Sequence, residues 1–293
     1  MKVTVMEAPA LVLRQTFDAL RGERPLPVHF AALWVTGTLD GLRRPTVAIV
    51  GTRAATGYGK AQARQFASTL GSAGCSILSG LALGIDAAAH EGALEAGAPT
   101  LGVLGSGHSR FFPRRNLALA ERMIAAGGGV LSPFEPQQIA WPSQFLQRNG
   151  VVAALADAVV VVEAPARSGA LNTASWAAGS IPVFAVPGDL DRPQFEGSHA
   201  LIRDGATLAR SPQDVLDELG LLRTRPEPAR GRAPRADALE ESILRDLDAC
   251  ERGLDELSES TRSDLGRLLA ALTVLEIDGA IERRDGARYS LRR

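Results

Sequence analysis

The residues with the clearest chemical potential form a glycine-rich loop, GTRAATGYGK, directly after a short apolar run at residues 46–50. A strand that ends in glycines and opens a helix points several backbone N–H groups and a positive helix end at one place, which suits a phosphate. The glycines at 51, 57 and 59 fit neither the dinucleotide fingerprint nor a P-loop. The loop therefore predicts either a general anion site beside Arg53 or a turn that only joins strand to helix.

Four more glycine-containing loops follow predicted strands, at residues 79–86, 104–116, 164–174 and 186–199. The carboxyl ends of parallel strands meet at one edge of a sheet, where ligands bind. Together the loops predict a surface for several phosphates, which favours a polynucleotide over a small metabolite. The arginines expected on this surface are Arg53, Arg110, Arg114, Arg115, Arg148 and Arg167.

Aromatic side chains occur in or beside the same loops. Such rings suit stacking on unpaired bases, although core packing is the better explanation for any single one of them. The candidates are Tyr58, Phe111, Phe112, Trp141 and Phe145, of which Phe111, Phe112 and Phe145 are the predicted stacking residues.

Residues suited to catalysis are few. Asp86 and His90, four apart on a predicted helix, form either an acid–base couple or a helix cap with a local hydrogen bond. Glu163 ends a predicted strand without a second carboxylate to pair with it. The four histidines lack metal-ligand spacing, and Ser168 lacks a nucleophile elbow. The sequence therefore predicts a protein that is not an enzyme and has no metal site and no cofactor.

Apolar runs that alternate with helical patterns must position these loops. The expected strands cover residues 46–50, 76–79, 99–104, 130–132, 158–163 and 182–186, and the expected helices cover residues 59–70, 85–96, 115–126, 145–155 and 171–178. The strands are apolar or β-branched throughout, as in a sheet covered on both faces. The pattern predicts an α/β fold with a doubly wound, mostly parallel sheet.

The C-terminal segment has a different pattern. Helical stretches at residues 238–249, 254–260 and 263–277 precede two short strands around a turn at Asp285 and Gly286, which predicts a small winged-helix-like domain. A stretch rich in proline and arginine before it is typical of a linker. The expected domains are an N-terminal extension (1–45), a Rossmann-like domain (46–220), the linker (221–236) and the winged-helix-like domain (237–293).

Composition bounds the class of protein. The 293 residues carry a formal net charge of −1, with 45% hydrophobic and 22% charged residues, which indicates a globular protein and excludes nucleic-acid binding by bulk positive charge. Without a signal peptide or an apolar membrane span, and with only two distant cysteines, we expect a cytoplasmic protein without membrane contact. Residues 236–293 carry 9 cations and 14 anions, which favours a protein contact over DNA binding there.

Seven blocks occur in this order along the chain: IVGTRAATGYG, LSGLALGIDAAAHEGAL, FPRRN, FLQRN, VVVVEAPARSGALNTA, FAVPG and EGSHALIRDGA. They resemble the signature blocks of the DNA-processing protein A family (DprA, also called Smf) over about residues 25–210. The C-terminal segment is similar to the winged-helix domain that many members carry.

The resemblance implies an extended Rossmann fold and a homodimer that binds and protects single-stranded DNA and loads the RecA recombinase onto it, mainly in natural transformation. Single-strand-binding protein is a further candidate partner. The loops and the resemblance together predict these residues as DNA contacts: Gly51, Arg53, Ser79, Gly80, Gly84, Arg110, Arg114, Arg115, Arg148, Asn149, Arg167, Ser168, Gly169, Gly188, Gly197 and Ser198.

Three features depart from the family pattern. The FLQRN block normally continues with an arginine, whereas this chain has Gly150, which removes one phosphate contact. His199 stands where an asparagine is usual. About 25 residues precede the matching part, so we expect the helical N-terminal domain of many members to be absent.

Two other functions stay open at this point. A Rossmann-like nucleotide-processing enzyme of the phosphoribohydrolase type would use Glu163 with Asp86 and His90, although ARSGALNTA lacks the double glycine and the glutamate of the P-G-G-x-G-T-x-x-E loop of such enzymes. A regulator of duplex DNA would act through the winged helix.

Overall fold

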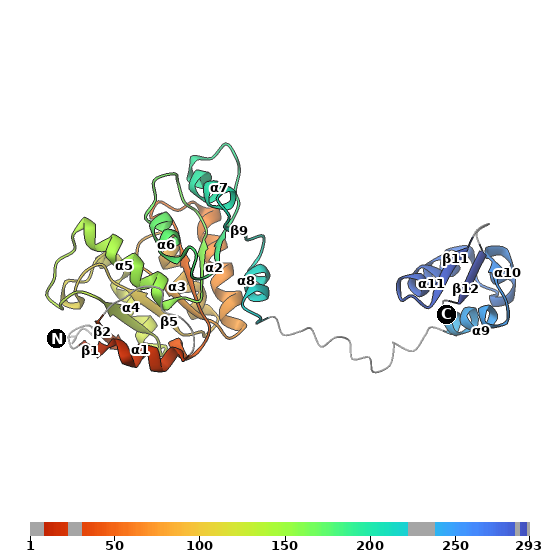
Figure 1. Ribbon diagram of the computed structural model, residues 1–293, viewed down its shortest axis with the longest axis horizontal. Coiled ribbons are helices and arrows are strands. Elements are labelled where there is room, and N and C mark those ends of the chain that lie inside the picture. Colours follow the sequence, from red (N-terminus) through yellow and green to blue (C-terminus); the bar gives the residue numbers. More distant parts are fainter. Residues whose placement is uncertain (1–8, 23–30, 222–237, 285–287, 292–293) are drawn as a thin grey trace. The chain divides into compact units, whose positions relative to one another are not determined.

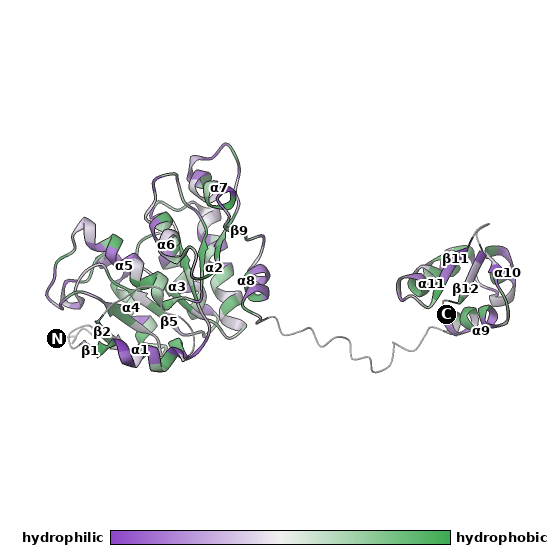
Figure 2. Ribbon diagram, viewed as in Figure 1, coloured by the Kyte–Doolittle hydropathy of each residue, from purple (hydrophilic) through white to green (hydrophobic). Residues whose placement is uncertain are grey.

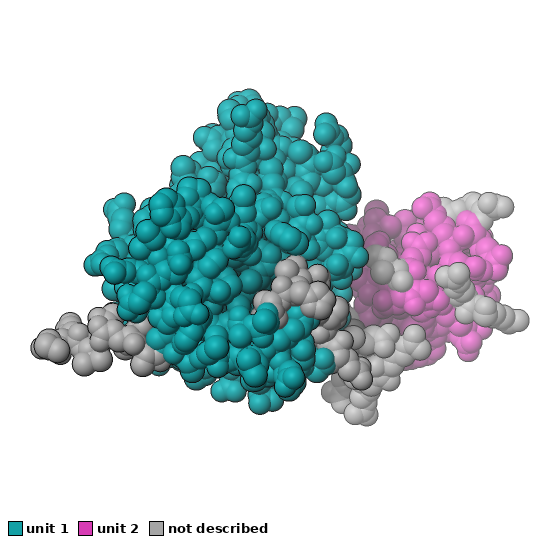
Figure 3. All heavy atoms as spheres, turned by 60° about the vertical axis from the view of Figure 1, so that its left-hand side comes forward, with its two compact units in different colours: residues 1–222 teal, residues 223–293 magenta. Residues whose placement is uncertain are grey.

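A computed structural model describes residues 9–22, 31–221, 238–284 and 288–291 (Figure 1). The chain divides into two compact units, residues 1–222 and residues 223–293, which Figure 3 shows in separate colours. The turn predicted at Asp285 and Gly286 and nearly all of the predicted linker lie outside the described residues.

The first unit is built on one large sheet. Its strands are β1 (Ala10–Leu13), β2 (Ala32–Gly37), β3 (Thr46–Val50), β4 (Ser76–Ser79), β5 (Thr100–Val103), β6 (Gly129–Ser132), β7 (Ala158–Val161), β8 (Val183–Ala185) and β9 (Thr207–Leu208). They lie in the order β1-β2-β6-β5-β4-β3-β7-β8-β9. Within this order, every pair of neighbouring strands from β6 through β3 to β9 is parallel. The predicted doubly wound, mostly parallel sheet is confirmed.

Helices cover both faces of this sheet. They are α1 (Arg14–Arg21), α2 (Gly57–Ser72), α3 (Ile85–Glu95), α4 (Leu117–Ala125), α5 (Pro142–Leu155), α6 (Gly169–Ala177), α7 (Glu196–Arg203) and α8 (Pro212–Glu218). One apolar core joins α2, α3 and α8 to one face, and a second joins α1, α5 and α6 to the other. In the described part of the chain, no helix has the length and apolar character needed to span a membrane.

Alternate residues of the central strands supply the two cores. In β3, Val47 and Ile49 belong to the core under α2 and α3, and Ala48 and Val50 belong to the core under α5 and α6. Successive side chains of a strand point to opposite faces, so a sheet covered on both sides needs an unbroken apolar strand. Hydrophobic residues accordingly concentrate in the strands and along the helix sides that face them (Figure 2).

The predicted N-terminal extension adds two strands to the sheet. β1 pairs with β2, and β2 pairs antiparallel with β6. The buried Arg21 anchors α1, because its guanidinium donates to the Leu155 carbonyl (2.5 Å) and the Asp157 carboxylate (2.6 Å). The other Asp157 oxygen accepts from the Thr46 N–H (2.7 Å) at the start of β3. This extension therefore packs on the same core as the central strands.

The order of the strands places a ligand site at one edge. From β3 the chain adds β4, β5 and β6 on one side, and it then returns to add β7, β8 and β9 on the other. Open α/β sheets bind ligands outside the carboxyl ends of the strands at such a reversal. The loops after β3, β4 and β7 meet there.

The second unit has its own core. Its elements are α9 (Ala238–Ala249), β10 (Arg252–Gly253), α10 (Leu254–Thr261), α11 (Leu265–Ile277), β11 (Ile281–Arg284) and β12 (Arg288–Leu291), with the strands in the order β10-β12-β11. Ile243, Leu257, Leu272 and Tyr289 are buried between the helices and the strands. Three helices followed by two paired strands form the predicted winged-helix-like domain, and β10 is an additional short strand.

Candidate functional site

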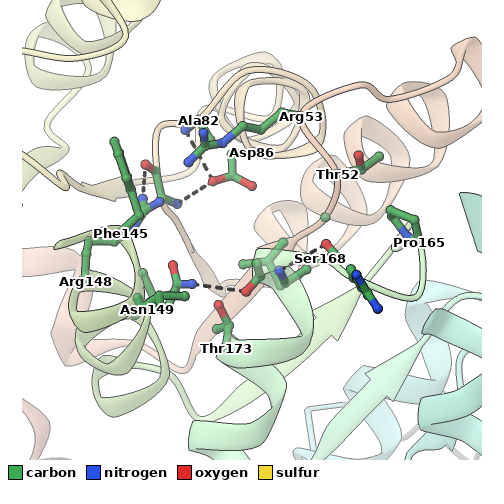
Figure 4. A pocket seen from close by; sticks show the side chains of 18 of the residues that line it. Thr52, Arg53, Ala82, Asp86, Phe145, Arg148, Asn149, Pro165, Ser168 and Thr173 are labelled. Atoms are coloured by element: carbon green, nitrogen blue, oxygen red, sulfur yellow. Dashed lines mark hydrogen bonds between the residues drawn. The ribbon is translucent and has the colours of Figure 1, made fainter. Parts of the chain in front are cut away.

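A pocket of about 520 Å³ opens at the strand reversal, where the loops after β3, β4 and β7 meet α5 and α6 (Figure 4). Among its lining residues in the described part of the chain, Asp86 is the only acidic one, whereas Arg53 and Arg167 are exposed cations. The predicted contact residues that line it are Gly51, Arg53, Gly80, Arg148, Asn149, Arg167, Ser168 and Gly169.

The amino end of α2, which the sequence predicted as an anion site, is filled by the chain's own carboxylate. Glu163 is fully buried, and its Oε2 accepts from the Thr56 N–H (3.1 Å) and hydroxyl (3.0 Å). Thr56 in turn caps the helix by accepting from the Gly59 N–H (3.0 Å). A Cβ at Gly59 would collide with the Glu163 carboxylate. The prediction of an external anion at this helix end is therefore wrong.

The amino end of α3 also has an internal carboxylate. Asp86 Oδ2 accepts from the backbone N–H groups of Gly80 (3.0 Å) and Ala82 (3.3 Å). Burial raises the pKa of the Asp86 carboxyl, and the Arg148 guanidinium and the two N–H groups act in the opposite direction. This helix end is therefore closed by an acid that takes up a proton more readily than an exposed aspartate does.

The amino end of α6 has no such group. Ser168 caps it, its hydroxyl accepting from the Ala170 N–H (3.2 Å), and the first turn holds no acidic residue. Arg167 stands directly before the cap, and Asn149 from α5 donates to the Gly169 carbonyl (3.1 Å) at the pocket wall. The positive end of α6 and the exposed Arg167 side chain therefore offer an external anion a site with no built-in competitor.

Arg148 lies in the floor of the pocket and is only 4% exposed. Its Nη1 donates to the carbonyls of Gly80 and Val103 (2.8 Å to the latter). Burial lowers the pKa of Arg148 to about 10, while the Asp86 carboxylate acts in the opposite direction. Arg148 therefore positions the loop after β4, and it lies deeper than the cations that an external phosphate meets first.

A row of cationic and aromatic side chains continues from the pocket. The Arg53 guanidinium carbon lies 4.7 Å from the centre of the Phe145 ring, and the Phe112 ring centre lies 6.0 Å from that of Phe145. Phe112 is 47% exposed. This row forms one wall of a second open pocket of about 650 Å³, which Arg110 and Arg114 also line.

Three other predicted residues have different roles. Phe111 is among the residues that line the second pocket, but it is only 7% exposed and packs in the core around α4, so its ring is not free to stack on a base, and that prediction is wrong. Arg115 is exposed but lines neither pocket. Ser79 is buried, and its hydroxyl donates to the Ile49 carbonyl (2.6 Å).

Two further predicted glycines, Gly84 and Gly197, shape the loops that form the pocket. A Cβ at Gly84 would collide with the Thr52 carbonyl, and one at Gly197 would approach the Ala164 and Pro165 carbonyls too closely. The N–H groups of Gly197 (2.9 Å) and Ser198 (3.3 Å) donate to the Ala164 carbonyl. These residues shape the loops after β3 and β7 without lining the pocket.

Gly188 lies in the loop after β8, and the unusual His199 lies on α7. The His199 Nε2–H donates to the Gly188 carbonyl (3.0 Å), and the imidazole stacks on Phe195 with ring centres 6.3 Å apart. A Cβ at Gly188 would collide with the Phe195 ring. His199 therefore fastens this loop to α7.

The predicted acid–base couple of Asp86 and His90 does not form. The Thr100 hydroxyl donates to the Ile77 carbonyl (2.9 Å), so it accepts from the His90 Nδ1–H (2.7 Å). Burial, followed by the charge of Arg148, lowers the pKa of His90 to about 3. His90 is therefore a neutral core histidine bound to Thr100 on β5, which is not the local hydrogen bond that the alternative explanation expected.

Sequence reasoning missed Thr52 and Thr173, which line the pocket beside Arg53 and Ser168 (Figure 4). Both are short polar residues without a motif of their own. Their position within glycine-containing loops was the only feature of the sequence that could have predicted them as pocket residues.

The fold and the pocket define a Rossmann-like protein with a cationic, anion-accepting edge and an attached winged-helix-like unit. Residues 23–220 match the family model of DNA recombination-mediator protein A, and residues 226–287 match that of the DprA winged helix domain. The chain belongs to the DNA recombination-mediator protein A family.

Two relatives show how far the similarity extends. Putative DNA processing protein DprA of Mycobacterium tuberculosis (strain CDC 1551 / Oshkosh) is 37% identical over 295 residues, which cover 98% of this chain and 75% of that protein. Protein Smf of Escherichia coli (strain K12) is 40% identical over 189 residues, which cover 64% of this chain and only 50% of that protein.

Two solved structures resemble the first unit. DNA processing protein A from Streptococcus pneumoniae has a TM-score of 0.66 and 34% identity, and the match covers 73% of this chain and 75% of that chain. DNA processing protein A from Helicobacter pylori, whose structure concerns the single-stranded DNA binding mode of that protein, has a TM-score of 0.62 and 28% identity. That match covers 72% of this chain and 94% of the other.

Proposed function

We propose that this protein binds single-stranded DNA without regard to sequence, protects it and loads a RecA recombinase onto it. The observation that carries the proposal is the amino end of α6, which is positive, open and flanked by Arg167 on the pocket. Phosphates carry the affinity of sequence-independent binding, and aromatic rings accept any base. The relative from Helicobacter pylori, studied for its single-stranded DNA binding mode, supports this choice of ligand.

The strand would follow two adjacent pockets. A phosphate at α6 lies beside Arg53, and the row of Arg53, Phe145 and Phe112 leads from there to Arg110 and Arg114. Exposed arginines lie at both ends of this course with two rings between them, and single-strand tracks combine cations with rings in this way. Loading of RecA, action as a homodimer in the cytoplasm and contact with single-strand-binding protein follow from the family resemblance and belong to the same proposal.

The proposal includes the absence of catalysis. A nucleotide-processing enzyme would need Glu163 as a base, but the Glu163 carboxylate is buried and accepts from the Thr56 N–H and hydroxyl at the α2 cap. This engagement supports binding rather than turnover. Incubation with nucleoside monophosphates should release no free base, and release that Glu163→Gln abolishes would favour the enzyme instead.

Arg53→Ala tests the binding function. We expect weaker binding to oligothymidine and to mixed-sequence strands alike, with the slope of log K against log salt reduced by about 0.7 for each phosphate that the variant no longer neutralises. Fluorescence anisotropy over a salt series measures both quantities. The matched control is Arg43→Ala, since Arg43 is exposed and lies just before the amino end of β3.

The same two variants test recombinase loading. If loading requires the bound strand, Arg53→Ala should slow assembly of RecA filaments on strands coated with single-strand-binding protein, and Arg43→Ala should not. Unchanged affinity and unchanged salt dependence in Arg53→Ala would remove this pocket from the DNA path.

A further inference from the structure

Trp176 on α6 lies against α5 at Gly150. A Cβ built on Gly150 would lie 3.4 Å from Cε2, 3.5 Å from Cδ2 and 3.6 Å from Nε1 of the indole. Gly150 itself is buried, whereas Trp176 is 45% exposed. A methyl group at Gly150 would therefore make ordinary van der Waals contact with the indole, which lies beside α5 while nearly half of the residue is exposed.

The three distances show which part of the ring faces α5. Cε2 and Cδ2 are the carbons shared by the two rings, so each is surrounded by ring atoms in the plane. A neighbour closest to these atoms must approach from above or below the plane. One face of the indole is therefore turned toward Gly150, and Trp176 as a whole is 45% exposed.

Trp176 does not line the proposed DNA pocket, but residues beside it lead to the pocket. Leu146 lines the pocket, is 51% exposed and lies one helical turn before Gly150 on the same side of α5. A helical side chain leans toward the amino end of its helix, so the indole lies over the turn that contains Asn172. Asn172 accepts from Asn149 (3.3 Å), which itself lines the pocket.

The charge of the surface favours a polyanion as the occupant. Neither α5 nor α6 contains an aspartate or a glutamate over its whole length, and Arg167 directly precedes α6. A nucleic-acid strand with a phosphate at the amino end of α6 would meet no like charge from these two helices on its way to Trp176.

We propose that the free face of Trp176 stacks on an unpaired base of the single strand whose phosphate lies at the amino end of α6. This inference rests on the proposed function and adds a second stacking position to the one formed by Phe112 and Phe145.

Trp176→Ala in the full chain tests the proposal. Base–aromatic stacking contributes about 1–3 kcal/mol per base, so affinity for oligothymidine should fall about 5- to 140-fold. The salt slope should stay unchanged because no charge is lost. Trp176→Phe keeps a ring and should bind within about threefold of the parent, and Ser175→Ala, an exposed neighbour on α6, should bind normally.

A fluorescence measurement provides a second readout that does not depend on a disruptive variant. Trp34→Phe combined with Trp141→Phe leaves Trp176 as the single tryptophan. Stacking predicts that oligothymidine quenches its emission with the same midpoint as the anisotropy titration.

The outcomes separate the two proposals. If the parent protein does not bind single strands, the proposed function fails. If it binds, but Trp176→Ala binds equally well and the emission of Trp176 does not change, only the stacking inference fails. Sedimentation without DNA measures the monomer–dimer equilibrium of Trp176→Ala. A shift in this equilibrium, together with unchanged affinity for the strand, would assign the indole to a contact between copies instead.

Discussion

The amino ends of α2 and α6 meet the same edge of the same sheet, yet their charges differ. Glu163 places a buried carboxylate at the start of α2, where the Thr56 N–H and hydroxyl bind it. Ser168 gives α6 only a neutral hydroxyl, and Arg167 adds a positive charge. The positive potential of α2 is therefore neutralised from inside the protein, whereas that of α6 is available to a ligand.

A glycine-rich turn from strand to helix is therefore not sufficient for an anion site. Such a turn supplies backbone donors, but a carboxylate from another strand can satisfy them first. The α3 end is intermediate, since Asp86 occupies it and burial raises the pKa of that carboxyl. Changes of charge at the three ends should accordingly affect DNA binding by very different amounts.

The largest effect is expected from making α6 resemble α2. Ser168→Asp keeps an efficient cap, because aspartate and serine are about equally good at this position. It also places a negative charge at the proposed phosphate site, so affinity for single-stranded DNA should fall about 10- to 100-fold at low salt. Anisotropy titrations measure the loss, and thermal unfolding checks that the fold is intact.

Ser168→Asn is the matched control, since it caps the helix without a charge and should keep most of the affinity. Unchanged affinity in a folded Ser168→Asp protein would mean that the phosphate does not bind at α6.

A smaller effect is expected at α3. Asp86→Asn removes the negative charge from the pocket lining while keeping an oxygen that accepts from Gly80 and Ala82. Affinity at pH 7 should rise roughly threefold, as expected for one partly screened charge.

The pH dependence provides the control. Because burial raises the pKa of Asp86, protonation begins at a higher pH than for an exposed aspartate and removes the same charge. The affinity of the parent should therefore rise as the pH falls toward this raised pKa, and the difference from Asp86→Asn should shrink. A constant difference between the two proteins at all pH values would contradict this account.

The smallest effect on binding is expected at α2. Glu163→Gln should change DNA affinity by less than about twofold, because the buried side chain is out of reach of the strand. It should still lower the free energy of unfolding by about 1–2 kcal/mol, since neutral hydrogen bonds replace charged ones. Urea unfolding measures this cost.

Glu91→Gln provides the comparison for Glu163→Gln, because Glu91 only forms an exposed ion pair with Arg64 and should alter the free energy of unfolding by less than about 1 kcal/mol. If Glu163→Gln strengthened DNA binding as much as Asp86→Asn, the α2 end would be open to the strand.

The sequence predicted the central strands and helices well. Runs such as TVAIV are apolar throughout, and the intervening helices carry their own apolar stripe, so the local pattern indicated both the elements and the doubly wound sheet. It missed the edge strands β1 and β9, which are short and largely exposed, and it also missed β2, which lies between β1 and β6. Leu11 and Leu13, for example, are 53% and 57% exposed in β1.

The candidate site was predicted in part. Arg53, Arg167 and Ser168 stand in loops that follow predicted strands, so the rule on parallel strands placed them at one edge, and the pocket brings them together. Phe111 and Phe112 are adjacent and chemically identical, and only packing made one a core residue and left the other exposed. No local pattern distinguishes two such neighbours.

The sequence by itself determined which residues form the central parallel strands, which loops carry glycine and arginine, and that these loops share an edge. Those properties depend on local periodicity and residue type. Only the tertiary structure decided which helix end is open. Glu163 reaches the α2 cap because β7 pairs directly with β3, and the bond to Thr56 spans 107 residues of sequence. Charge complementarity between residues so far apart in sequence depends on the neighbours that folding provides. The position of Trp176 beside Gly150 depends on them in the same way.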